Sequence, residues 1–421
     1  MKVWGRRQIF AVAGLMVVWL IGVVLAASGT QISARSSIPS FSHSNEKAGR
    51  SAVLSLVGSH AFALAGGQAP SDRPQTSDEA FKNIQALKGI PVDDFMGTMG
   101  IMSAALGFDC SECHIGAGTD HVNWEFDTPR KRTARKMVAM VTAINRDNFG
   151  GRQVVTCWTC HRGRDRPVVT PSLGYVYGSP IVESDDILAP TPGLPLSADQ
   201  ILDKYTQALG GAQRLAGLTS FVGKGTSVGF GGFGGGGQVQ MFAKAPDQRT
   251  TIIEFKDDPN RGDSTRSYNG RAGWIKTPLT VLGEYALSGG ELDGARLDAQ
   301  LSFPGQIKGV LTNLRVSSPT TINGREVQVV QGTGPRGLVA TLYFDKESGL
   351  LVRLLRYGKS PIGRVPTQVD YADYRDVNGI KMPFRWTFAW LDGRDSFELS
   401  EVQLNVPIDA AKFGRPVSPK R

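Results

Sequence analysis

The four cysteines of this 421-residue chain occur as two copies of one short pattern. The copies are Cys110-Ser-Glu-Cys113-His114 and Cys157-Trp-Thr-Cys160-His161. Two thiols three residues apart can each add to one vinyl group of the same porphyrin, and the adjoining histidine is then held where it can bind the iron. The pattern therefore predicts two covalently bound haem c groups, with His114 and His161 as iron ligands.

Three other uses of paired cysteines fit this pattern less well. A four-cysteine zinc site usually separates its pairs by about 15–20 residues, whereas residues 114–156 lie between these pairs. A thioredoxin-like dithiol needs one motif beside a βαβ unit, not two copies that are each followed by histidine. Disulfides within each pair would leave both histidines unexplained. Haem attachment accounts for all six residues.

A helix that carries methionines is predicted ahead of the first motif. It spans Val92–Leu106, because Pro91 precedes it, acidic residues open it and Gly107 follows it. Four apolar residues share one face of this helix, and they are Phe95, Met99, Met102 and Leu106. Such a stripe is usually core packing, but a methionine thioether is also a common axial ligand of haem c. We predict Met99 as a ligand of the first haem, with Met96 as the alternative.

A second helix is predicted ahead of the second motif, over residues 129–145, with Asp127 or Thr128 as its N-cap. Its apolar stripe consists of Met137, Met140, Val141 and Ile144. We predict Met137 as a ligand of the second haem and Met140 as the alternative. The basic residues of this helix, Arg130, Lys131, Arg132, Arg135 and Lys136, are expected to face solvent, and they could also pair with haem propionates or dock an acidic redox partner.

The segment from Phe81 to Pro167 resembles the cytochrome c subunit of photosynthetic reaction centres, including its shorter bacterial relatives. The phrases that carry the resemblance are Phe95-Met-Gly-Thr-Met99, Ser103-Ala-Ala-Leu-Gly-Phe-Asp-Cys110-Ser-Glu-Cys-His114, Ala134-Arg-Lys-Met137-Val-Ala-Met-Val-Thr-Ala-Ile-Asn145 and Val155-Thr-Cys157-Trp-Thr-Cys-His-Arg-Gly163. In that family each haem follows a helix that donates its sixth ligand. The resemblance therefore implies Met99 and Met137 as sixth ligands, and His114 and His161 as proximal ligands.

The resemblance also implies an electron carrier, not an enzyme. The photosynthetic members carry four haems in two internal pairs, whereas this chain has cysteines for two. Residues 146–156, where the family can have an extra haem-binding histidine, contain none. We therefore expect a short, two-haem relative that exchanges single electrons with redox proteins. These partners would be a membrane electron-transfer complex, a soluble cytochrome, or both.

The N-terminal region has the pattern of an exported protein. Residues 1–30 contain basic residues followed by an uncharged apolar run from Ile9 to Ala27. This run is about as long as a bilayer is thick, so the segment is predicted to be an export signal or a membrane anchor. Residues 31–76 are predicted to form a poorly ordered linker, with a second candidate cleavage site near Ala65. Either route places the haems on the periplasmic side of the inner membrane, anchored or secreted.

The predicted fold class is α+β, with several domains. A mainly α-helical dihaem cytochrome c domain is expected over residues 77–167, and a Pro-rich linker over residues 168–196. Residues 197–421 are predicted to form an antiparallel β-rich domain that begins with one helix capped by Ser197. Strand-like segments include Glu326–Gln331, Val339–Phe344, Leu350–Tyr357 and Phe384–Leu391. This helix-first arrangement loosely resembles half-barrel carriers of the bacterial lipoprotein-sorting type.

Charge and composition favour some partners and leave other functions open. The net charge of +9 suggests acidic partners or a membrane surface, and no recognised nucleic-acid-binding motif is present. His121 is an alternative axial ligand within the predicted cytochrome domain. One alternative function is a dihaem peroxidase or haem sensor, which requires an iron with an open position. Another is a β-domain carrier of an apolar ligand with an appended cytochrome.

Overall fold

The computed structural model describes residues 73–119, 121–178, 187–229, 236–255, 262–278 and 282–416. The predicted export segment and most of the linker 31–76 lie outside the described residues. No helix within the described ranges is long and apolar enough to cross a membrane. The described residues belong to one compact unit that spans residues 68–421. The domain boundaries expected from the sequence stay predictions.

The first described segment is helical. It contains α1 (Ser77–Ala80), α2 (Val92–Leu106), the short 3-10 helix η1 (Cys110–Glu112), α3 (Pro129–Phe149) and α4 (Cys157–His161). The bounds of α2 agree with the prediction, and Gly107 ends the helix with a positive φ of 67°. Thr128 caps α3, because its hydroxyl accepts a hydrogen bond from the backbone of Lys131. Helix α3 continues to Phe149, four residues beyond its expected end.

One large antiparallel sheet follows. Its thirteen strands within the described ranges are β1 (Ser220–Val228), β2 (Gly236–Lys244), β3 (Gln248–Glu254), β4 (Asp263–Asn269), β5 (Gly273–Lys276), β6 (Glu284–Ala286), β7 (Thr312–Ile322), β8 (Arg325–Thr333), β9 (Val339–Asp345), β10 (Leu351–Ser360), β11 (Gly363–Val377), β12 (Ile380–Trp390) and β13 (Gly393–Leu404). The spatial order is β6-β5-β4-β3-β2-β1-β13-β12-β11-β10-β9-β8-β7. Two meanders are therefore joined where β1 pairs with β13.

The sheet agrees with the strand predictions. The four segments singled out in the sequence fall in β8, β9, β10 and β12, with ends that differ by at most four residues. The turn Asn378-Gly379 joins β11 to β12, and both of its residues have positive φ. The large antiparallel sheet and the accompanying helices confirm the α+β class.

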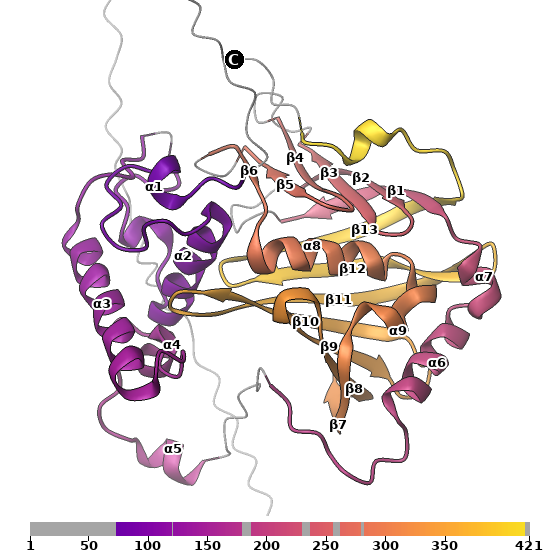
Figure 1. The fold of residues 1–421 in the computed structure, drawn as a ribbon, viewed down its shortest axis with the longest axis horizontal. Helices are drawn as coiled ribbons and strands as arrows, with labels where there is room; N and C mark the ends of the chain where they lie inside the picture. Colours follow the sequence, from indigo (N-terminus) through magenta and orange to yellow (C-terminus); the bar gives the residue numbers. More distant parts are fainter. Residues whose placement is uncertain are drawn as a thin grey trace, which may run out of the picture. The chain divides into compact units, whose positions relative to one another are not determined.

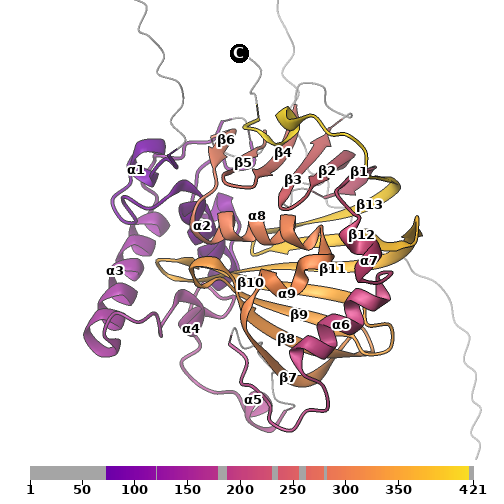
Figure 2. The same cartoon turned by 45° about the vertical axis from the view of Figure 1, so that its right-hand side comes forward.

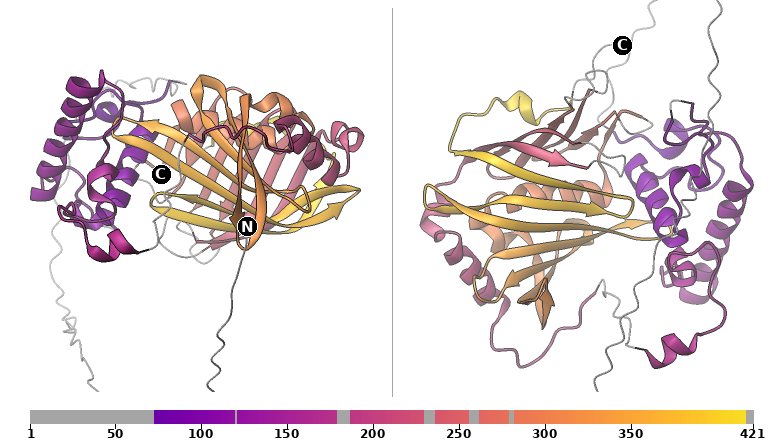
Figure 3. Two further views of the ribbon diagram at one scale, coloured as in Figure 1. Left: turned by 90° about the horizontal axis from the view of Figure 1, so that it is seen from below. Right: turned by 180° about the vertical axis from the view of Figure 1, so that it is seen from behind.

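Helices cover one face of the sheet. These are α6 (Ala198–Ala208), α7 (Ala212–Ala216), α8 (Gly289–Leu301) and α9 (Ile307–Val310). Figures 1 and 2 show α6, α8 and α9 on this face, and the view from behind in Figure 3 shows the strands of the opposite face. The main apolar core lies between these helices and the sheet. Ser197 caps α6 as predicted, but α8 and α9 were not predicted.

The Pro-rich region is less uniform than expected. It contains a short helix, α5 (Leu173–Tyr177), that the sequence did not predict. Further on, the chain runs along the edge strand β7, where the backbone of Thr191 donates to the carbonyl of Val316 over 3.1 Å. The backbone of Leu188 also donates to the side chain of Gln331. This part of the linker covers an edge that would otherwise present unpaired backbone groups.

Candidate functional site

Helix α2 has two different faces. Val92, Ile101 and Ala105 are each at most 5% exposed, and the helix packs against β10, β11 and α8. The stripe predicted from the sequence, which consists of Phe95, Met99, Met102 and Leu106, is only partly buried. The small and branched residues of α2 therefore contact the sheet, while the stripe that carries the predicted ligand remains partly accessible.

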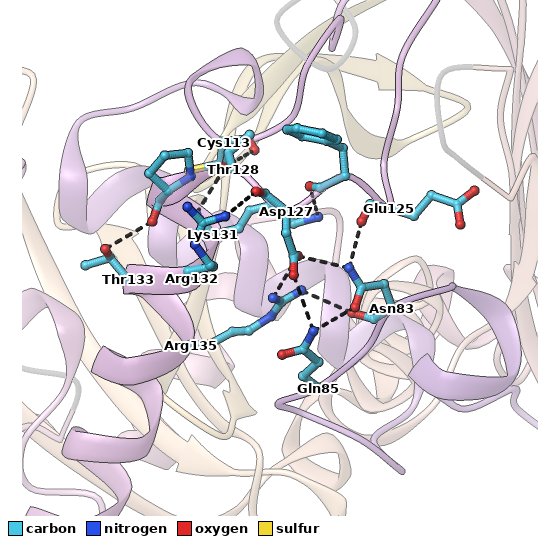
Figure 4. A network of polar contacts seen from close by, with 12 residues as sticks. Asn83, Gln85, Cys113, Glu125, Asp127, Thr128, Lys131, Arg132, Thr133 and Arg135 are labelled. Carbon is cyan, nitrogen blue, oxygen red and sulfur yellow. Dashed lines mark hydrogen bonds and ion pairs between the residues drawn. The ribbon is translucent and has the colours of Figure 1, made fainter.

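The first cysteine motif lies on a tight 3-10 turn just after α2. Asp109 caps this turn, because its carboxylate accepts hydrogen bonds from both the backbone and the hydroxyl of Ser111. The backbone of His114 donates to the carbonyl of Cys110 over 2.9 Å. The hydroxyl of Thr128 donates to the carbonyl of Cys113 over 3.0 Å, so the cap of α3 also fixes the end of the motif (Figure 4).

A polar network holds the segment between this motif and α3 (Figure 4). The side-chain amide of Asn83 donates to Asp127 over 2.9 Å, and Arg135 forms an ion pair with the same carboxylate over 2.8 Å. Lys131 donates to the carbonyls of Trp124 and Phe126. These contacts join Asn83 and helix α3 to the loop before α3. They therefore fix the position of Trp124, whose ring lies beside His114.

The imidazole of His114 sits in a partly buried, positively charged environment. Its ring centroid lies 5.0 Å from that of Trp124. Burial, and then the charge of Lys131, lower the pKa of His114 below its usual value. Its Nδ1 atom is buried and makes no hydrogen bond of ordinary geometry. These surroundings favour the neutral imidazole, which is the form that binds metals.

The second motif forms helix α4 itself. Thr156 and Thr159 form a reciprocal capping box at its start. Cys157, Cys160 and His161 are three and four residues apart, so the helix turns them to one side. The Nδ1–H of His161 donates to the carbonyl of Arg164 over 2.9 Å. This bond leaves Nε2 available, as in many metal-bound histidines whose other nitrogen is held by a carbonyl.

Helix α2 contacts both motifs. Its C-terminal end leads into the first motif, and its flank packs along α4. The backbone of Gly163, just after the second motif, donates to the carbonyl of Ala105 over 2.8 Å. An added Cβ on Gly107 would lie 2.5 Å from the carbonyl oxygen of Gly163, so a glycine is needed at this approach. Met102 packs in the same cluster as Cys157. The two motifs are thus neighbours across α2.

The residues of both motifs fit covalently bound haem. All four cysteines are free thiols, and burial raises the pKa of Cys113 and Cys157. Large apolar side chains are unusually exposed in this part of the described chain, namely Ile115, Phe126, Met140, Val154 and Trp158. Ile115, Val154 and Trp158 lie within three residues of a motif cysteine, and exposed apolar groups beside the thiols are what a large apolar cofactor would cover. No group of three or more His, Cys, Asp or Glu side chains that could hold a metal ion occurs among the described residues.

The candidate sixth ligands are less sharply defined. Met96, Met99 and Met137 are partly buried, Met140 is 43% exposed, and His121 is exposed. Met99 and Met137 stay predictions as ligands. Sequence reasoning missed Ile362 and Asp392, which come from turns of the sheet and lie close to the motifs. They have no sequence signal, since their proximity arises from tertiary packing across more than 200 residues.

Solved structures with some similarity to this chain include a LolA superfamily protein and a lipoprotein-sorting protein domain. A LolA superfamily protein from Nitrosomonas europaea aligns over 52% of this chain and 98% of its own length, with 15% identity and a TM-score of 0.35. A lipoprotein-sorting protein domain from Vibrio parahaemolyticus aligns over 50% of this chain and 97% of its own, with 10% identity and a TM-score of 0.35. At these scores, the strand order given above remains the basis for the architecture of the sheet.

Residues 46–171 match the family described as "Photosynthetic reaction centre cytochrome C subunit". The photosynthetic reaction center cytochrome c subunit of Thermochromatium tepidum is 34% identical over 104 residues. The match covers 24% of this chain and 24% of that protein, so the chain spans about a quarter of the length of this relative. The match confirms the resemblance inferred from the cysteine motifs. In this segment the chain is similar to the reaction centre cytochrome c subunit family, which implies a cytochrome-like electron carrier with covalently bound haem.

Proposed function

We propose that this protein is a dihaem c-type cytochrome that transfers single electrons on the periplasmic side of the inner membrane. Cys110 and Cys113 would attach one haem, and Cys157 and Cys160 the other. His114 and His161 would bind the two irons from one side, with Met99 and Met137 as the opposite ligands. The observation that carries this proposal is the pair of complete motifs with four free thiols inside the family-matched segment.

The haem supplies the redox chemistry, since its iron accepts and releases one electron. The chain binds, orients and shields it. The hydrogen bond from His161 to the carbonyl of Arg164 fixes the orientation of the ring. Lys131 and burial favour a neutral His114. The partly buried stripe of α2, which includes Met99, offers an apolar wall beside both motifs. These are the roles expected of a carrier, and no enzymatic step is part of the proposal.

The surroundings of the second motif support redox proteins as partners. Arg162, Arg164 and Arg166 directly follow this motif, and all three are exposed. The side chain of Trp158 within the motif is 45% exposed. Basic groups around an exposed apolar centre favour transient docking of an acidic redox protein, with fast association that weakens as salt is added. The membrane would be reached through residues 1–30, as the sequence predicts.

Covalent attachment provides the direct test. The full chain, produced in a bacterium that exports it and attaches haem, should keep two haems after denaturation and extraction with acidic acetone. Cys110→Ser/Cys113→Ser and Cys157→Ser/Cys160→Ser should each keep one haem, because each double variant removes one pair of thiols. The measurements are the intact mass and the haem-to-protein ratio.

Two outcomes for the unmutated chain would contradict the proposal. One is loss of the haem into the solvent during extraction, which would mean that no thioether bonds form. The other is zinc bound in place of haem in the purified chain. If either double variant kept both haems, the assignment of the motifs would be wrong.

A further inference from the structure

The turn between β10 and β11 enters the helical segment. Ile362 in this turn is completely buried, and its neighbours are Ile101 of α2 and Val138 of α3. An added Cβ on Gly363 would lie 3.3 Å from Cδ1 of Ile101 and 3.7 Å from Cβ of Thr156. The turn therefore fills the space between α2 and the start of α4. In Figure 1, α2 lies between the sheet and α3.

The same turn contacts a haem-attachment motif. Cys157 packs against the cluster that Ile362 helps to form, and so does Met102 of α2. The side-chain amide of Gln153 donates to the carbonyl of Ser360 over 2.8 Å. This hydrogen bond joins the loop that leads into the second motif to the strand that leads into the turn. The sheet therefore contacts both Cys157 and the loop that precedes it.

A second turn of the sheet supports α2 nearby. An added Cβ on Gly100 would lie 3.5 Å from Cβ of Leu391 and 3.6 Å from Oδ1 of Asp392, both in the turn between β12 and β13. Close approach is also seen at Gly97, where an added Cβ would lie 3.2 Å from Cγ2 of Val365. Glycines on α2 thus allow the helix to lie directly against the strands.

We propose that the β10–β11 turn is a positioning element of the second haem site, with Ile362 as its central residue. This inference rests on the proposed function, because it requires that Cys157 and Cys160 bind haem. By excluding water beside Cys157, Ile362 disfavours the more highly charged ferric state and raises the reduction potential of that haem. The sheet, and not only the helical segment, then sets the potential of one of the two haems.

Two substitutions of similar shape test this role. Ile362→Val keeps the site apolar. Ile362→Thr introduces a side chain with nearly the same shape as valine, but with a hydroxyl group in place of one methyl group. In the full-length holoprotein, Ile362→Thr should shift one of the two midpoint potentials downward relative to Ile362→Val, and the other potential should stay in place. In the Cys157→Ser/Cys160→Ser background, the same comparison should give no shift, because only the first haem remains. Spectroelectrochemical titration measures the two potentials of each dihaem variant and the single potential of each one-haem variant.

Two further variants distinguish a specific effect of Ile362 at the second haem site from a general loss of protein stability. Ile253→Thr makes the same change at a residue of β3 that is 4% exposed and lies in the main core, so it should leave both potentials unchanged. Gln153→Ala removes the hydrogen bond to the turn without altering the apolar cluster, and it should lower the same potential by a smaller amount. This variant still tests the idea if Ile362→Thr fails to fold.

The possible results distinguish this inference from the proposed function. Absence of covalent haem from the unmutated protein would remove the proposed function itself. Two covalent haems with no difference between Ile362→Thr and Ile362→Val would overturn the positioning role and leave the proposed function intact. Equal shifts of both potentials, or the same shift in Ile253→Thr, would also overturn it.

Discussion

Met99 lies on the partly buried face of α2, roughly opposite the residues that contact the sheet. Gly97 and Ile101 approach the strands, and each is two residues from Met99, which on an α-helix is slightly more than half a turn. Met99 therefore lies on a different side of the helix from the residues that approach the strands. This geometry permits iron ligation by Met99, whereas Met102 packs in the cluster that contains Ile362.

Substitutions of Met99 distinguish ligation from packing. A histidine ligand stabilises ferric haem relative to a methionine ligand, so Met99→His should lower one potential and leave the other nearly unchanged. Met99→Ala should open a coordination position and produce a high-spin ferric signal. The weak sulfur-to-iron absorption band should fall to about half in either variant, since one of two methionine ligands is lost. The ferric spectrum of each variant measures this.

Met96→Leu and Met140→Leu serve as controls for Met99, because leucine conserves most of the volume and cannot bind iron. Both should keep the full sulfur-to-iron band. If the band is missing in the unmutated protein, no methionine is a ligand, and His121 is the alternative residue to test. If the band survives undiminished in Met99→Ala, another methionine such as Met96 is the ligand. An open iron in the unmutated protein would favour the peroxidase or sensor function instead.

At the scale of elements, local signals in the sequence predicted α2, α3 and the strands, but not α8. Pro91, Gly107 and Thr128 mark helix ends through backbone conformation and capping, which depend on neighbouring residues alone. Helix α8 contains Gly289, Gly290 and Gly294, which lower helix propensity and hid it. The structure explains two of these glycines.

Two glycines of α8 are required by close contacts with strand β10. An added Cβ on Gly290 would lie 2.8 Å from Cα of Gly358 in β10, and one on Gly294 would lie 2.4 Å from Nε of Arg356. Arg356 is only 2% exposed and forms an ion pair with Asp298 of α8 over 3.4 Å. Local sequence signals do not report tertiary contacts of this kind. For that reason the cysteines and histidines of the candidate site could be predicted from the sequence, but Ile362 could not. Covalent attachment needs fixed spacing along the chain, whereas packing partners can come from anywhere.

Helices α2 and α8 are joined by a buried contact. The carboxylate of Asp93 on α2 accepts hydrogen bonds from the backbone and the hydroxyl of Ser288, each over 2.5 Å. Ser288 is the N-cap of α8, so Asp93 also meets the positive end of that helix dipole. Asp93 is 4% exposed. Because the donors would be left buried and unpaired, this contact should matter for stability.

Asp93→Ala should lower the free energy of unfolding by about 1–3 kcal/mol, the usual cost of leaving buried polar groups unpaired. Asp94→Ala is the matched control. Burial raises the pKa of both carboxyl groups, that of Asp94 to about 7. Ser288 donates its two hydrogen bonds to Asp93 and not to Asp94, so the loss of Asp94 should cost less. Denaturant unfolding of Asp93→Ala, Ser288→Ala and the double variant gives the coupling energy. Simple additivity of Asp93→Ala and Ser288→Ala would contradict a stabilising contact.

At the scale of the whole molecule, the helical segment and the sheet form one compact unit and are not two independent domains joined by a linker. The described residues belong to the same compact unit, and the contact between them includes the buried side chains of Ile101, Ile362 and Asp93. Apolar burial of this kind holds parts of a protein together without a covalent connection. The reduction potentials of the proposed haems should then depend on a sheet that lies outside the family-matched residues.

Cutting the chain between Gly178 and Ile187 tests this unity. With a protease site inserted there, the two cleaved pieces should still elute together in gel filtration, because the α2 contact survives the cut. Gly97→Leu should separate them, since an added Cβ already lies 3.2 Å from Val365 and a larger side chain would push α2 from the sheet. Gly174→Leu is the matched control, because its added Cβ meets nothing within 4 Å. Pieces that separate without any substitution would show that the linker, and not the packing of α2, keeps the two parts together.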